Sequence, residues 1–315
     1  MTEFQISLES LTSLKDKVVL ITGSTSGIGK ATVTLCLSLG AKVIAGDVNP
    51  FPEAFLQEQQ QQNKLPDADN LLYIQTDVSN WASIRTLFVR GVAHFGRIDH
   101  VLANAGIGPR SNFLEEMFES GLDTYDEGND TAGEDGARLA PPDLRVLDVN
   151  LLGVIYTLRL SVYYLRRNSS STEGGETSPS ITVTASASSF QDFSAADYTV
   201  AKHGVLGLLR GLYTDLQQES FKIRLNAIAP SWTATGIVPE DIVKQSGAEV
   251  QEPEVVARSV VMLCVDRMRH GEVIYSWGGR FMEINRCEGG LLNGVAGIVP
   301  NVKAEGVVME KLKGR

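Results

Sequence analysis

The sequence predicts an α/β fold in which helices cover both faces of a doubly wound parallel sheet. Short runs of β-branched and aliphatic residues recur along the chain, and segments with helical periodicity alternate with them. A glycine-rich turn follows the first of these runs directly. Strands that alternate with helices form a parallel sheet, and its ligands bind at the carboxyl ends of the strands.

The first strand, turn and helix form a candidate phosphate-binding unit. A strand at 18–22 leads into Gly23, and Gly27 and Gly29 follow before a helix expected over 30–39. Such a loop turns backbone N–H groups and the positive end of a helix toward a pyrophosphate. A turn that only needs the freedom of glycine at positive φ is the simpler alternative.

An acidic residue follows the second strand, which we expect over 42–46. Asp47 stands at its carboxyl end, where a carboxylate accepts hydrogen bonds from the adenosine ribose and repels the 2′-phosphate of NADP. No arginine or lysine precedes Lys30 in the glycine loop or directly follows Asp47. These residues favour NAD over NADP.

The alternation of strands and helices continues along most of the chain. Further strands are expected at 71–75, 98–103, 181–184, 223–228 and 273–276. Asp143 is expected to cap a helix over 144–167 that carries Asn150. The pattern predicts one domain over 1–315, with a core at 14–280, surface insertions at 108–142 and 168–180, and an extension at 281–315 without clear periodicity.

A helix expected over 197–218, capped by Asp197, carries a candidate acid/base pair. Tyr198 and Lys202 stand four residues apart and therefore share one helix face. An ammonium beside a phenol favours the phenolate and lowers a pKa that starts near ~10. Tyr198 is thus a candidate for moving a proton on and off a substrate oxygen. On spacing alone, an ordinary surface pair is the simpler explanation.

Composition excludes several classes of function. The net charge of −10 argues against a nucleic-acid-binding surface. No apolar run of about 18 residues is present, so no membrane span is expected. The three cysteines lack metal-ligand spacing and the four histidines form no cluster, so no metal site is expected. With a polar N-terminus, these features predict a cytoplasmic protein.

Taken in order, the motifs resemble the short-chain dehydrogenase/reductase family over roughly residues 14–280. The resemblance implies a single-domain Rossmann-type sheet of about seven parallel strands and a nicotinamide cofactor. Segments 74–106 and 198–230 resemble the NAD-linked hydroxyprostaglandin dehydrogenases in particular. The matching motifs are Thr22-Gly-x-x-x-Gly-Ile-Gly29, Asp77-Val78, Asn104-Ala-Gly106, Asn150, Ser186, Tyr198-x-x-x-Lys202 and Asn226-x-x-x-Pro230.

The resemblance implies roles for four catalytic residues. Tyr198 would be the general acid/base at the substrate oxygen. Lys202 would lower the pKa of that tyrosine and hold the nicotinamide ribose. Ser186 would orient the substrate oxygen, and Asn150 would hold a water in a relay that returns the proton to solvent.

The resemblance also implies a set of cofactor contacts. The glycine loop would line the pyrophosphate, Asp47 the adenosine ribose, Asp77 the adenine, Asn104 the second ribose and Thr235 the carboxamide. Tyr198 and Lys202 belong to this set as well. The remaining members are Gly23, Ser26, Gly27, Ile28, Gly29, Val78, Ala105, Gly106 and Pro230.

Two departures from the family pattern lie beside these motifs. Ala103 stands where the family has an asparagine, and Ser231 stands where it has a glycine. Neither removes a catalytic group. The segment between Thr235 and Pro253 is short, so the insertion at 108–142 or the C-terminal tail is expected to cover the substrate.

Two functions remain open from the sequence. The first is an NAD(H)-dependent oxidoreductase that interconverts a secondary alcohol and a ketone. The second is a non-redox protein on the same fold, either a cofactor-binding scaffold or a cyclase or isomerase. The resemblance further implies a homodimer or homotetramer in which the helices at 144–167 and 198–218 pack across a two-fold axis.

Overall fold

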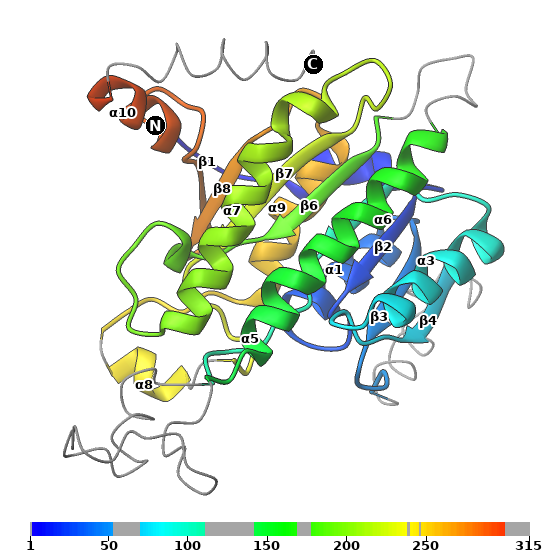
Figure 1. Cartoon of the computed structure of the whole chain (residues 1–315), viewed down its shortest axis with the longest axis horizontal. Helices are drawn as coiled ribbons and strands as arrows, with labels where there is room; N and C mark the ends of the chain where they lie inside the picture. Colours follow the sequence, from blue (N-terminus) through cyan, green and yellow to red (C-terminus); the bar gives the residue numbers. More distant parts are fainter. Residues whose placement is uncertain are drawn as a thin grey trace, which may run out of the picture.

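The computed structural model shows one nine-stranded sheet within the residues that it describes, with helices on both faces (Figure 1). These residues are 2–52, 70–110, 142–168, 178–237, 240–245 and 247–299. Most of the two predicted insertions and the end of the C-terminal extension therefore lie outside the described residues.

Seven of the nine strands are parallel, which confirms the expected architecture. The strand order is β1-β9-β8-β7-β6-β5-β2-β3-β4. Their bounds are β1 Glu3–Phe4, β2 Val18–Thr22, β3 Lys42–Asp47, β4 Leu71–Gln75, β5 His100–Ala103, β6 Ser180–Thr184, β7 Arg224–Pro230, β8 Val273–Trp277 and β9 Arg280–Glu283.

The two remaining strands correct the expectation for the chain ends. β9 lies in the segment expected to lack regular structure, yet it pairs antiparallel with β8, and β1 pairs antiparallel with β9. The turn between β8 and β9 consists of Gly278 and Gly279, both at positive φ. This turn returns the chain along the edge of the sheet, and Phe281 then packs in the core.

The helices follow the strands in the order that a doubly wound sheet requires. They are α1 Gly27–Ser38, α3 Trp81–Phe95, α5 Arg145–Leu147, α6 Gly153–Asn168, α7 Ala196–Leu216, α8 Glu240–Gln245, α9 Pro253–Val265 and α10 Leu291–Ile298. Three further helical segments are present in the described residues: the 3-10 helix η1 Leu8–Leu14, the π-helical turn η3 Asp148–Leu152, and the 3-10 helix η4 Ala187–Ser189.

The molecule has two hydrophobic cores, one on each face of the sheet, and alternating side chains of the central strands contribute to both. In β2, Val18 and Leu20 face the core under α3, α6 and α7, whereas Val19 and Ile21 face the core under α1 and α9. All four are buried. A strand covered on both faces needs apolar residues at every position, which explains the continuous apolar runs in the sequence.

Two helix starts differ from the expected ones. Ala195 rather than Asp197 is the N-cap of α7, and Asp197 lies in the first turn. Leu144 rather than Asp143 is the N-cap of α5. The carboxylate of Asp143 accepts from the backbone N–H of Arg145 at 2.9 Å. Both carboxylates still bind backbone N–H groups near a helix start, as the excess of unpaired donors there favours.

The helix Arg145–Arg167 is long and apolar enough, by length and composition alone, to cross a membrane. Its most apolar 18-residue window has a mean hydropathy of 1.4, although no such run was expected from the sequence. Within the protein 44% of that window is buried. Val154, Leu158 and Leu165 contribute to the core on this face, so part of the apolar character is that of a core helix.

Candidate active site

A cavity of about 350 Å³ opens at the carboxyl ends of the parallel strands. This is the position that a doubly wound sheet predicts for its ligand. Fifteen of the sequence-predicted site residues line it: Gly23, Ser26, Gly27, Ile28, Asp47, Asp77, Val78, Asn104, Ala105, Gly106, Ser186, Tyr198, Lys202, Pro230 and Thr235. Gly29 and Asn150 lie outside this lining.

The glycine loop approaches neighbouring backbone too closely for side chains. Gly23 has φ +66°, and a Cβ there would lie 2.7 Å from the Cα of Ala105. Gly27 has φ +48°, and a Cβ there would lie 2.9 Å from the Cβ of Thr235. A Cβ on Gly29 would lie 1.8 Å from the carbonyl oxygen of Gly23. Gly29 therefore packs the start of α1 beneath the loop, while the other two glycines line the cavity.

Asp47 holds the loop and faces the cavity. One carboxylate oxygen accepts from the N–H of Thr25 and the other from the N–H of Asn49, each at 3.0 Å. A carboxylate has about four acceptor sites, so both oxygens can also accept from a ligand hydroxyl. The structure thus places a negative charge at the β3 end of the cavity.

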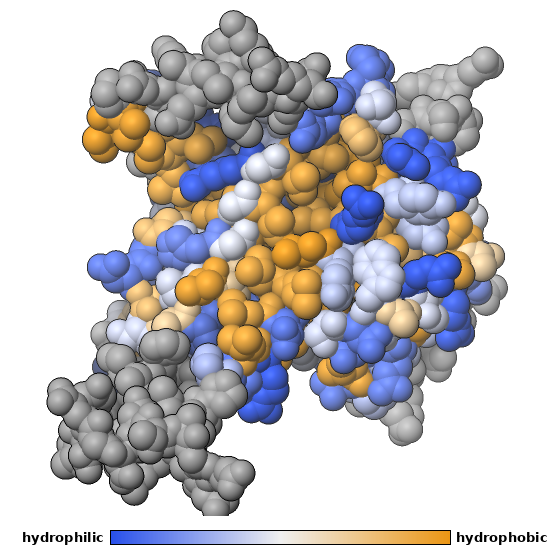
Figure 2. All heavy atoms as spheres, viewed as in Figure 1, coloured by the Kyte–Doolittle hydropathy of each residue, from blue (hydrophilic) through white to orange (hydrophobic). Residues whose placement is uncertain are grey.

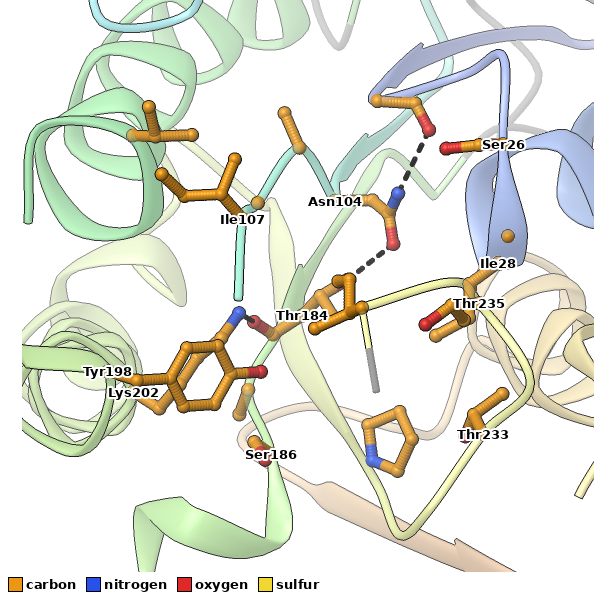
Figure 3. A pocket seen from close by; sticks show the side chains of 18 of the residues that line it. Ser26, Ile28, Asn104, Ile107, Thr184, Ser186, Tyr198, Lys202, Thr233 and Thr235 are labelled. Carbon is orange, nitrogen blue, oxygen red and sulfur yellow. Dashed lines mark hydrogen bonds between the residues drawn. The ribbon is translucent and has the colours of Figure 1, made fainter. Parts of the chain in front are cut away.

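Asn104 connects the glycine loop to the opposite wall. Its amide nitrogen donates to the carbonyl oxygen of Gly23 at 3.2 Å, and its amide oxygen accepts from the Thr184 hydroxyl at 3.2 Å (Figure 3). The carbonyl oxygen of Thr184 then accepts from Nζ of Lys202 at 2.8 Å. One chain of hydrogen bonds therefore runs from β2 across β5 and β6 to α7.

Tyr198 and Lys202 project from α7 into the same space, as their spacing predicted (Figure 3). Nζ of Lys202 lies 5.5 Å from the centroid of the Tyr198 ring. Burial lowers the pKa of Lys202 to about 8. An ammonium without a carboxylate partner loses hydration there and gains little in return.

The expected fall in the pKa of Tyr198 is not found in the protein alone. Burial raises the pKa of Tyr198 above its usual value, and a hydrogen bond with Ser186 offsets this only in part. Desolvation of the phenolate is the larger effect because the ring is mostly enclosed. In the protein without a ligand, burial therefore shifts this pKa in the direction opposite to the fall that the spacing of Tyr198 and Lys202 predicted.

Ser186 is held in place relative to α7 by a neighbouring serine. Its hydroxyl accepts from the N–H of Ser188 at 3.2 Å, which caps η4. The hydroxyl of Ser189 accepts from the N–H of Ser186 and donates to the carbonyl oxygen of Lys202, at 3.2 and 2.8 Å. This double contact ties the Ser186 turn directly to the helix that carries the tyrosine.

Asn150 lies in the π-helical turn η3 and is completely buried. Its side-chain oxygen accepts from the N–H of Ile107, and its side-chain nitrogen donates to the carbonyl oxygen of Ile107, both at 2.8 Å. The side chain therefore clamps the backbone that follows β5. Its expected role in a water relay stays a prediction.

The other predicted contacts are distributed along the cavity. Asp77 lies beyond β4, and its Oδ1 accepts from the N–H and the hydroxyl of Ser79, at 2.9 and 2.6 Å. Pro230 ends β7, and the N–H of Ser231 donates to the carbonyl oxygen of Ser276 at 2.9 Å. Ser231 has no positive φ, so the turn does not require the family's glycine.

Several cavity residues carried no signal in the sequence. The ring centroid of Phe193 lies 6.2 Å from that of Tyr198 and 6.0 Å from that of Trp232. All three rings line the cavity. Thr184 could have been found, because it ends a strand beside Asn104. Phe193 and Trp232 stand in loops without motifs.

In the part of the chain that the structure describes, no three His, Cys, Asp or Glu side chains are grouped so that they could hold a metal ion. Cys36 and Cys264 are buried in the core under α1 and α9. Burial raises the pKa of both thiols, that of Cys264 to about 12. A buried thiol of this kind behaves as a small apolar side chain.

Comparisons with known proteins identify the family of this chain. The family model for short chain dehydrogenase matches residues 17–245. A short-chain dehydrogenase/reductase, ascJ, of Acremonium egyptiacum is 40% identical over 284 residues, which cover 90% of this chain and 86% of that protein. The human 15-hydroxyprostaglandin dehydrogenase [NAD(+)] is 26% identical over 276 residues, covering 82% and 90%.

Solved structures show the same fold. Levodione reductase superposes with a TM-score of 0.66 at 26% identity, covering 84% of this chain and 98% of that one. A 3-ketoacyl-(acyl-carrier-protein) reductase of Brucella melitensis, complexed with NADH, gives a TM-score of 0.65 at 23% identity, covering 85% and 99%. The matched family model spans the glycine loop, Asn104, Ser186 and the Tyr198–Lys202 pair. The chain belongs to the short-chain dehydrogenase/reductase family of oxidoreductases.

Proposed function

We propose that this protein is an NAD(H)-dependent dehydrogenase or reductase that interconverts a secondary alcohol and a ketone. The observation that carries the proposal is the meeting of Ser186, Tyr198 and Lys202 at one end of the cavity whose other end holds the glycine loop and Asp47. A protein that only bound a dinucleotide would not need a proton donor beside the second half of the site.

The residues present fit a nicotinamide dinucleotide, the type of cofactor that this family uses. Gly23 and Gly27 leave a cradle that side chains would fill. Asp47 offers acceptors to ribose hydroxyls and would repel a 2′-phosphate, which supports NAD over NADP. The human relative is named for NAD(+) as well. Lys202 uses one of its three N–H donors on Thr184, which leaves donors for the second ribose.

The protein's own groups would handle the proton and the orientation of the substrate. When bound, the cofactor supplies or accepts the hydride. In the reduction, the phenol of Tyr198 would give its proton to the carbonyl oxygen of the substrate. Ser186 donates a hydrogen bond to the same oxygen, and the charge of Lys202 stabilises the phenolate that remains. Because burial raises the pKa of Tyr198, the phenol keeps its proton at neutral pH and can donate it.

The first test compares cofactor binding with turnover. We expect NADH to bind more tightly than NADPH in a fluorescence titration, and a panel of secondary alcohols to be oxidised with NAD. Tight NADPH binding would contradict the role given to Asp47. Dinucleotide binding without turnover on any secondary alcohol or ketone would favour the non-redox alternative.

The second test replaces the proposed acid/base. We expect Tyr198→Phe to lower kcat by about 10²- to 10⁴-fold, because general acid–base catalysis contributes that much. NADH affinity should stay close to that of the wild type. Tyr163→Phe is the matched control, since Tyr163 is exposed on α6 and lies outside the cavity lining. A Tyr198→Phe enzyme that keeps its kcat would disprove the assignment.

A further inference from the structure

The Tyr198 end of the cavity is built from rings, and its shape and charge restrict the substrate. We propose that it binds an uncharged cyclic ketone or secondary alcohol whose flat apolar ring lies against Phe193 and Trp232. This inference rests on the proposed function and specifies its substrate class. It comes from residues in loops that match no motif.

The aromatic wall runs directly from the proposed acid/base. Phe193 stands between Tyr198 and Trp232, with ring-centroid distances of 6.2 and 6.0 Å and interplanar angles of 53° and 50°. Each ring is only partly buried by the protein and lines the cavity. Aromatic faces at such distances offer a flat apolar ligand a continuous surface, and stacking adds to the energy of its burial.

An aliphatic wall also lines the cavity. Ile107, Pro109, Val149 and Ile237 supply it. Asn150 fixes the backbone of Ile107, as described above. A Cβ on Gly108 would lie 2.9 Å from Cγ2 of Ile237, so the segments that follow β5 and β7 touch across this end.

The same wall is fastened to the helix that carries Tyr198. The N–H of Arg110 donates to the Asp197 carboxylate at 3.0 Å, and Asp197 directly precedes Tyr198 in α7. The segment 107–110 is therefore held at both ends, by Asn150 and by Asp197. A fixed site lined by aromatic and aliphatic side chains suits a flat, stiff ligand better than a flexible chain, because less conformational entropy is lost on binding.

The charges of the described lining residues favour an uncharged substrate. Among the described residues that line the cavity, only Asp47, Asp77 and Lys202 are charged. Asp47 is the last residue of β3, and Asp77 follows β4. Lys202 donates to Thr184 and is needed beside Tyr198 and the second ribose. Among the described lining residues, a substrate carboxylate or phosphate at the aromatic end would find no cation besides Lys202, and burial of an unpaired charge is unfavourable.

The test compares three ketones of similar size with NADH and the full-length enzyme. They are 4-phenylcyclohexanone, the same molecule with a carboxylate on the phenyl ring, and an open-chain aliphatic ketone with the same number of carbons. We expect kcat/KM for the neutral ring ketone to exceed that for the carboxylate by about 100-fold, the cost of an unpaired buried charge. The open-chain ketone should fall between them.

Two variants connect this preference to the aromatic wall. Phe193→Leu and Trp232→Leu should each raise KM for the ring ketone about tenfold while kcat and NADH affinity change little, because the ring contacts bind substrate without taking part in proton transfer. The open-chain ketone should show little change. Trp81→Leu is the control, since Trp81 is an exposed tryptophan of α3 that packs on Tyr156, outside the cavity lining.

Equal kcat/KM for the neutral and carboxylated ketones would overturn the inference, as would variants that leave the preference for the ring ketone unchanged. Calorimetric binding of the same ketones to the Tyr198→Phe variant loaded with NADH repeats the comparison without turnover. If the Tyr198→Phe variant prefers the ring ketone but the wild type turns over no substrate, the proposed oxidoreductase function fails and the proposed binding of a ring against Phe193 and Trp232 stands. If turnover occurs but charged or open-chain ketones are preferred, the ring site fails and the redox proposal stands.

Discussion

Lys202 combines a positive charge with nearly complete burial, since only 3% of the residue is exposed. Its partners are the carbonyl oxygen of Thr184 and the face of the Tyr198 ring rather than a carboxylate. Burial therefore lowers its pKa from 10.5 to about 8. A buried ammonium without an acidic partner destabilises the fold, and its presence is understandable where a ligand uses the charge.

This burial predicts a pH dependence of stability. Between about pH 8 and pH 10.5 the unfolded chain holds more protons at this lysine than the folded chain, so stability from this group rises with pH over that window. A Lys202→Met variant lacks the effect. We expect the difference in free energy of unfolding, wild type minus variant, to increase from pH 7 to pH 10 in denaturant titrations of the cofactor-free protein.

The exposed Lys15 provides the matched control, because Lys15→Met removes a lysine without removing a buried charge. Parallel curves for the wild type and Lys202→Met over this range would contradict the assignment. Cofactor affinity should fall for Lys202→Met and stay unchanged for Lys15→Met.

At the scale of elements, one arginine joins β7 to the end of α9. The last carbonyl groups of a helix have no partners within it. The guanidinium of Arg224, at the start of β7, donates to the carbonyl oxygens of Leu263, Cys264 and Asp266 at 2.7, 2.7 and 2.8 Å. It also donates to the Ser178 hydroxyl at 2.8 Å. Five N–H groups in a fixed plane suit this position better than any other side chain.

Removal of the Arg224 guanidinium should destabilise the folded protein, because it disconnects α9 from β7. We expect Arg224→Met to lower the free energy of unfolding by about 3 kcal/mol, because several buried carbonyl groups lose their donors together. Arg90→Met, on the exposed face of α3, should change it by less than about 0.5 kcal/mol. Urea denaturation of both variants checks the difference, and equal midpoints would show that Arg224 does not hold α9.

At the scale of the molecule, α6 and α7 cover the same face of the sheet (Figure 1). The turn η3, which precedes α6, comes close to α7 at Gly204, where a Cβ would lie 2.8 Å from Cδ1 of Leu151. Apolar side chains gather on this face (Figure 2). Ile155 of α6 and Val200 of α7 are large hydrophobic residues exposed to 38% and 55%. Both helices belong to the contact expected across the two-fold axis, and the homodimer or homotetramer stays a prediction.

We expect a Val200→Glu variant to weaken self-association, because it places a charge in the predicted contact between α7 and its symmetry mate. Sedimentation velocity at micromolar concentration should show a shift toward monomer. Val89→Glu, at an exposed valine of α3, should leave the oligomer intact. A wild-type monomer, or a Val200→Glu variant with unchanged sedimentation, would contradict the predicted interface.

The sequence by itself determined the fold class, the seven parallel strands, the cavity at their carboxyl ends and most of the residues that line its glycine-loop end. These depend on local patterns: a run buried on both faces is apolar throughout, and a loop against backbone needs glycine, as at Gly23. That Tyr198 and Lys202 share one face of a helix likewise follows from their four-residue spacing alone.

Only the tertiary structure decided the pKa values within the site and the residues that surround it. The raised pKa of Tyr198 comes from burial by distant segments, which no four-residue spacing contains. Asn150 clamps Ile107 from 43 positions away, and Phe193 meets Trp232 through loops without periodicity. β9 became a strand because the β8 edge offered unpaired backbone groups. Contacts of this kind arise from where the chain folds back on itself, so they cannot be recognised from local sequence.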